Sequence, residues 1–125
     1  MTLDEFKQCV IEQPESVTFN LTMSVIAEHF DYQPMAFSNG LLPRPIVNPP
    51  GVNEGSCKVF ALAHFLDLNE DQTLNCFGDY YRQDVLDAPQ GIDHKNIRTF
   101  MRDGWMGVEF EGEALALKET LKGLL

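Results

Sequence analysis

The chain has 125 residues, with 19 acidic and 9 basic side chains and a formal net charge of −10 at pH 7. This length suits one compact domain, and a hydrophobic content of 44% is enough to build a core. The acidic balance argues against a nucleic-acid partner, because phosphate binding depends on clustered Lys and Arg. No apolar run is long enough to cross a membrane, and three cysteines without paired spacing predict reduced thiols.

Two helices are predicted in the first 30 residues. Thr2 and Glu5 form a capping-box pattern, and Pro14 ends the helix that follows. From Thr18 to Phe30, apolar residues recur at a helical spacing and predict a second helix.

The next segment combines a predicted strand with a long loop. Residues 32–37 favour a short strand before a turn at Asn39-Gly40. Residues 41–53 contain four prolines and predict an extended surface loop. Because this loop also carries apolar side chains, we expect it to cover a pocket as a lid or to contact a second copy in a homodimer.

The central part of the chain predicts two further helices. Residues 53–68 are apolar nearly all round, which indicates a buried central helix, and His64 is interpreted as a core histidine within it. Asn69 and Gln72 mark the start of the next helix, which is predicted to run to about residue 85. Gly78 inside that helix favours close packing against another backbone.

The C-terminal third predicts one short helix, one strand and one terminal helix. Asp93 is the expected cap of a helix that ends at Gly104, residues 108–111 alternate as a strand does, and residues 113–125 favour a helix. The predicted fold is therefore a single α+β domain over residues 1–125. It is predominantly helical, with five or six helices and one or two short strand pieces.

Two residues are candidates for catalysis. Cys57 lies near a predicted helix start, where the helix dipole stabilises a thiolate, and His94 could act as its base. The simpler interpretation, a buried thiol that behaves as a small hydrophobe, is favoured. His29, His64 and His94 lack the spacing of a metal site, and no nucleotide-binding or hydrolase motif is present. We therefore expect no metal and no cofactor.

Four strings of residues carry a resemblance to a known family. They are Phe37-Ser-Asn-Gly40, Asn53-Glu-Gly-Ser-Cys-Lys58, Cys76–Arg82 followed by Asp84-Val-Leu86, and Asp93–Arg98 continued to Gly104-Trp105. In this order they resemble the HopJ type III effector family of bacterial proteins, from the first helix to about Leu115. The resemblance implies no established catalytic activity or cofactor, and its name implies type III secretion into a host.

The function expected from these observations is binding of a small molecule or a protein partner. Polar residues of the shared strings are predicted to gather around one pocket. These candidate ligand-binding residues are Asn39, Asn53, Glu54, Lys58, Tyr81, Arg82, Asp84, Asn96 and Arg98. A small enzyme that uses Cys57 and His94 is the alternative. Because residues 2–13 do not resemble a flexible, Ser-rich leader, the expected location is the bacterial cytoplasm.

Overall fold

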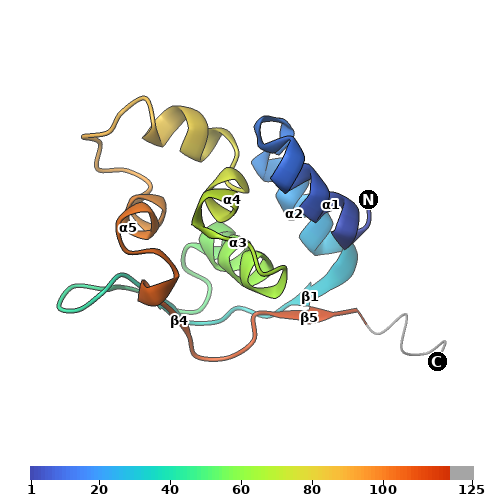
Figure 1. Cartoon of the computed structure of the whole chain (residues 1–125). Helices are drawn as coiled ribbons and strands as arrows, with labels where there is room; N and C mark the ends of the chain where they lie inside the picture. Colours follow the sequence, from blue (N-terminus) through green and yellow to red (C-terminus); the bar gives the residue numbers. More distant parts are fainter. Residues whose placement is uncertain (119–125) are drawn as a thin grey trace.

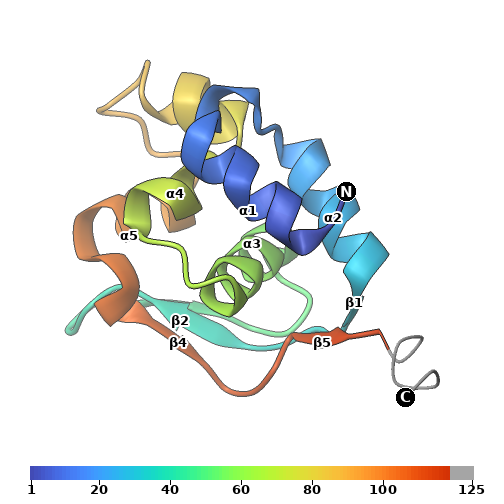
Figure 2. The same cartoon turned by 45° about the vertical axis from the view of Figure 1, so that its right-hand side comes forward.

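The computed structural model describes residues 1–118, which form a mostly helical α+β domain. Figures 1 and 2 show the helices on one side of two short antiparallel sheets, with α3 in the middle of the helical layer. The α-helices are α1 (Leu3–Glu12), α2 (Phe19–His29), α3 (Glu54–Phe65), α4 (Glu70–Asn75) and α5 (Lys95–Asp103). Shorter helical turns are η1 (Pro14–Ser16), η2 (Tyr80–Val85) and η3 (Gly104–Gly107). The predicted fold class is confirmed.

Five short strands are present among the described residues, where the sequence predicted one or two. They are β1 (Phe30–Tyr32), β2 (Phe37–Asn39), β3 (Ile46–Asn48), β4 (Val108–Phe110) and β5 (Leu115–Leu117). One sheet has the order β3-β2-β4 and the other pairs β1 with β5. The single strand predicted at residues 32–37 was wrong in its bounds, because residues 33–36 connect β1 to β2.

Three other boundaries also differ from the sequence prediction. The segment 41–53 is not loop throughout, because β3 pairs with β2 and buries Asn48. The predicted helix from 69 to 85 is interrupted after α4 at Gly78, whose φ is +62°. The predicted terminal helix is wrong at β5, which pairs with β1 instead; residues 119–125 lie outside the described part of the chain.

Helix α3 is buried as predicted, and it organises the core. Phe60 is completely inaccessible to solvent and lies at the centre of an aromatic cluster. Its ring centroid is 4.9 Å from that of Phe100, 5.5 Å from that of Phe77 and 5.9 Å from that of Phe37. This cluster joins α3 to α5, to the chain after α4 and to β2, so it fixes the elements that surround the candidate site. None of the helices formed by residues 1–118 has the length and apolar character needed to cross a membrane.

Candidate functional site

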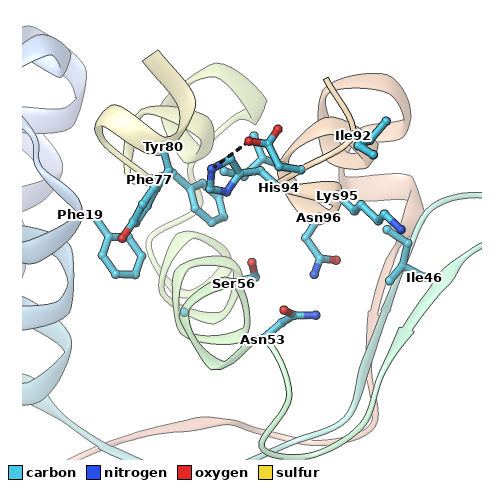
Figure 3. Close-up of a pocket in the computed structure, with 13 residues that line it drawn as sticks. Phe19, Ile46, Asn53, Ser56, Phe77, Tyr80, Ile92, His94, Lys95 and Asn96 are labelled. Carbon is cyan, nitrogen blue, oxygen red and sulfur yellow. Dashed lines mark ion pairs between the residues drawn. The ribbon is translucent and has the colours of Figure 1, made fainter. Parts of the chain in front are cut away.

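A pocket of about 610 Å³ lies where the first turns of α3 and α5 approach each other. Figure 3 shows that its two sides differ in chemistry. Aromatic residues from α2, from the chain after α4 and from η2 form one side. Asn53 and Ser56 of the α3 start, Asn96 of α5 and Ile46 of β3 form the other. The loop 41–53 therefore supplies part of a wall through Ile46, while its Leu42 and Val47 side chains are exposed.

The aromatic side is held together by ring contacts. Phe19 and Tyr80 meet edge to face with centroids 5.1 Å apart, and the Tyr80 ring lies 5.3 Å from the His94 ring. Residue 55 is glycine where α3 passes this wall, and a Cβ there would come within 2.9 Å of Phe19 Cζ. The absence of a side chain at Gly55 therefore allows the Phe19 ring to pack directly against the first turn of α3.

Both helix starts at the pocket have the same unusual backbone geometry. Asn53 precedes α3 with φ 55°, and His94 precedes α5 with φ 48°, so both are left-handed. Asn and His are among the residues that adopt this conformation most readily. Neither side chain caps its helix, so the first N–H groups of both helices receive no cap from these residues. The expectation that Asp93 caps α5 was wrong, since His94 occupies the cap position.

Four asparagine side chains form a hydrogen-bonded cluster behind the polar side of the pocket. Asn48 Oδ1 accepts hydrogen bonds from Asn53 Nδ2 at 2.7 Å and from Asn96 Nδ2 at 2.9 Å. Asn39 Nδ2 donates to Asn96 Oδ1 at 3.1 Å and to the Asn96 carbonyl at 2.9 Å. Asn39 and Asn48 are completely buried, and Asn96 is nearly so. The cluster connects β2 and β3 to the first residues of α3 and α5.

His94 lines the pocket and lies beside two carboxylates. Its Nε2 is 3.1 Å from Asp84 Oδ2 and 3.8 Å from Asp93 Oδ2. Arg98 holds Asp93 at 2.7 Å, and this hydrogen bond lowers the pKa of the Asp93 carboxyl. Asp93 and Lys95 both line the pocket, so their side chains place opposite charges at its rim.

Of the residues predicted to share one pocket, only some come together. Asn53, His94 and Asn96 line it, Asn39 supports it from behind, and Asp84 contacts His94.

The sequence did not single out Asn48, because it lies in a proline-rich stretch interpreted as a surface loop. Phe19 and Tyr80 were also missed as site residues, because aromatic residues at a helical spacing are typical of a core.

The arginines and Tyr81 of the predicted set have structural positions outside the pocket. Arg82 donates to the carbonyl groups of Pro14, Val17 and Asn75 and so joins η1 to α4. Arg98 donates to the Ala88 carbonyl and to Asp93, and it thereby holds the loop before α5. Tyr81 packs against the core, and its burial raises the pKa of its hydroxyl.

The structure does not support Cys57 as a nucleophile. Its side chain is 1% exposed, and its thiol lies 3.6 Å from the Met35 carbonyl. Burial raises the pKa of Cys57, so the thiol is protonated at neutral pH and is not poised to attack. Glu54 and Lys58, on the same helix, do not line the pocket; Lys58 Nζ lies 4.6 Å from the centre of the Tyr32 ring.

The described residues contain no cluster of three or more His, Cys, Asp and Glu side chains able to hold a metal ion. His64, interpreted from the sequence as a core histidine, is exposed, and its ring lies 5.9 Å from the Trp105 ring. That interpretation was wrong because α3 turns this position outward, toward η3.

Comparison with known proteins places the chain in a family. The family model described as HopJ type III effector protein matches residues 3–115. The chain belongs to the HopJ family. This confirms the resemblance carried by the four strings. None of the curated proteins matches the chain.

A solved structure shares the HopJ fold of this chain over nearly its whole length. It is titled as the crystal structure of an unknown-function protein, VPA0580, and is 43% identical in sequence. The two superimpose with a TM-score of 0.89, covering 94% of this chain and 95% of the other. Neither the family description nor this neighbour assigns a specific biochemical activity, so the function must be argued from the pocket.

Proposed function

We propose that this HopJ protein is a binding module for a small organic molecule. The observation that carries the proposal is the two-sided pocket, in which an aromatic wall faces a row of amide and hydroxyl groups (Figure 3). Its volume of about 610 Å³ falls in the range of ligand-binding pockets, roughly 300–1,000 Å³. A ligand with a flat apolar part and a polar end fits this arrangement.

Each side of the pocket contributes differently to binding. A ring placed beside Phe19 and Tyr80 buries apolar surface, worth about 25 cal/mol per Å², and gains an aromatic contact of roughly 1 kcal/mol. Asn53, Ser56 and the uncapped first turns of α3 and α5 then orient the polar end by hydrogen bonds. Because the α3 and α5 starts are anchored by buried asparagines, the polar groups keep their positions before a ligand arrives.

Fragment titration followed by NMR tests this function. Benzyl alcohol, benzamide and benzoate are added separately to ¹⁵N-labelled protein, and the backbone amide signals are recorded. We expect shifts centred on Gly55, Ser56 and Lys95 for at least one fragment, because these residues line the pocket. Signals that move only elsewhere, or no saturable shift with any fragment, would show that the pocket does not bind this class.

A matched pair of variants distinguishes binding in the pocket from non-specific binding to exposed aromatic side chains. Tyr80 and Phe65 are aromatic residues of similar exposure, 44% and 50%, but only Tyr80 lines the pocket. Tyr80→Ala should weaken fragment binding at least several-fold, whereas Phe65→Ala, at the other end of α3, should leave it unchanged. Equal weakening in both variants would argue against the proposal.

A further inference from the structure

The orientation of the asparagine cluster is fixed by backbone carbonyl groups. Asn48 Nδ2 lies 3.3 Å from the carbonyl oxygens of Phe37 and Ile46, and a carbonyl oxygen can only accept. The nitrogen of the Asn48 amide must therefore face β2 and β3. Asn48 Nδ2 also lies 3.3 Å from Asn96 Oδ1, and Asn48 Oδ1 then faces the Nδ2 atoms of Asn53 and Asn96.

The same logic applies to Asn96. Asn39 Nδ2 donates to the Asn96 backbone carbonyl, so the Asn39 amide is also anchored by an obligate acceptor. The Asn96 atom 3.1 Å from Asn39 Nδ2 is then Oδ1, and Asn96 Nδ2 faces Asn48 Oδ1. These independent anchors give one consistent arrangement, and a flipped amide would place two acceptors or two donors against each other.

Asn53 is the member of the cluster that is exposed at the pocket. Its Nδ2 must donate to Asn48 Oδ1, which leaves its own Oδ1 without a donor from any residue in 1–118. Figure 3 shows the Asn53 amide, the Asn96 amide and the Ser56 hydroxyl turned toward the same space. The pocket therefore presents a hydrogen-bond acceptor at this point.

We infer that Asn48 determines the ligand specificity of the pocket by fixing Asn53 with its oxygen outward, so that the pocket selects ring compounds that carry a hydroxyl or N–H donor. This inference rests on the proposed binding function and names its ligand class. Asn48 is a positioning residue, since it is completely buried and does not line the pocket. A ligand with an acceptor alone would meet Asn53 Oδ1 with a lone pair and lose this hydrogen bond.

A pair of probes that differ in one donor tests the inference. Benzyl alcohol donates a hydrogen bond, while its methyl ether has the same ring and only an acceptor. Titration of the wild-type protein should give a Kd about tenfold lower for the alcohol than for the ether. Equal Kd values would overturn the inference while leaving the proposed binding function intact.

Two variants test whether the asparagine cluster causes the preference for benzyl alcohol over its methyl ether. Asn53→Gly removes the amide and still allows the left-handed backbone, so both probes should bind with similar Kd values. Asn48→Ala removes the acceptor that orients Asn53, and the preference should fall at least several-fold. If Asn48→Ala does not fold, the ratio of the two Kd values in Asn53→Gly tests the inference alone. A preference that persists in Asn53→Gly would overturn the inference.

A spectroscopic measurement tests the orientation without any ligand. The Nδ2 protons of Asn53 should resonate away from those of the exposed, solvated Asn20, because one of them is hydrogen-bonded to Asn48. In Asn48→Ala the Asn53 signals should move to the Asn20 position, and unchanged signals would overturn the orientation. If neither probe binds wild-type protein, and benzamide and benzoate do not bind either, the proposed function fails together with its ligand class, and this measurement still decides the role of Asn48.

Discussion

The backbone of Gly78 lies directly against the backbone of Phe19. A Cβ at position 78 would come within 2.6 Å of Phe19 N and 3.1 Å of the Thr18 carbonyl carbon. Gly78 also has a φ of +62°, which L side chains adopt at a cost. This contact ends the helical stretch after α4 and positions Phe19 at the aromatic side of the pocket.

We predict that Gly78→Ala lowers the free energy of unfolding by roughly 2–5 kcal/mol. Left-handed strain accounts for about 1–2 kcal/mol and overpacking against backbone for about 1–3 kcal/mol. Gly51→Ala is the matched control, because Gly51 has a φ of +83° but a Cβ added there would meet no atom within 4 Å. Urea denaturation of both variants should show a loss near 1–2 kcal/mol for Gly51→Ala. Equal losses would show that the contact with Phe19 is unimportant.

Phe60→Ala should lower the free energy of unfolding by about 3–5 kcal/mol, as expected when a buried aromatic side chain is removed. Phe60 is 0% exposed and contacts four other aromatic rings. Phe65→Ala on the same helix should cost far less, because Phe65 is 50% exposed. The comparison uses chemical denaturation monitored by circular dichroism. A small loss for Phe60→Ala would mean that α3 is not the centre of the core.

Arg82→Lys should destabilise the protein by roughly 2–3 kcal/mol although it conserves the charge. The guanidinium donates to three backbone carbonyls at once, and a lysine ammonium on a flexible stem cannot reproduce that geometry. Arg102→Lys is the control, because Arg102 is 66% exposed and pairs with the adjacent Asp103. Its melting temperature should stay within about a degree or two of the parent. Similar melting temperatures for both variants would contradict a structural role of Arg82.

The stability of the protein should fall above about pH 8.5, the ordinary pKa of a thiol. Burial raises the pKa of Cys76 to about 12, so above pH 8.5 the unfolded thiol loses its proton while the folded thiol keeps it. The folded state then binds more protons than the unfolded state, and the free energy of unfolding decreases as pH rises. The loss from Cys76 should reach about 1–2 kcal/mol at pH 10.

The variant Cys76→Ala isolates this contribution. It should be less stable than the parent by a constant amount from pH 6 to pH 8, because its packing loss does not depend on pH. The gap between the two proteins should then narrow by about 1–2 kcal/mol at pH 10. A gap that stays constant up to pH 10 would show that the Cys76 thiol ionises equally in both states.

Local signals in the sequence were enough to locate most helices. The capping boxes at Thr2 and Asn69 are both present, and α1 and α4 begin directly after these residues. The apolar run of α3 is buried as predicted, and Gly104 ends α5 with a positive φ. These helix starts and ends depend on residues within one or two turns of each other, so they can be predicted from the local sequence alone.

Alternation at residues 108–111 predicted a strand, and β4 (Val108–Phe110) confirms it, but two other strands could not be located from local signals. Residues 46–48 lie in a proline-rich stretch, and residues 115–117 lie in a segment rich in helix formers. Residues 46–48 become a strand because β2, across the connection formed by residues 40–45, satisfies their backbone hydrogen bonds. Residues 115–117 become a strand because β1, far away in the sequence, satisfies theirs. Deletion of residues 44–47 would be harmless in a surface loop, but here it removes part of β3, so we expect it to destabilise the fold.

The sequence by itself determined the family, the helical α+β class and the central position of α3, and it named Asn39, Asn53, His94 and Asn96 as candidates. Only the tertiary structure decided which polar groups share a site. It directed Arg82 and Arg98 to backbone carbonyls, buried Cys57 away from water and added Asn48. The physical reason is that a hydrogen bond depends on distance and direction in space, and those are set only when α3, α5 and the β3-β2-β4 sheet pack together.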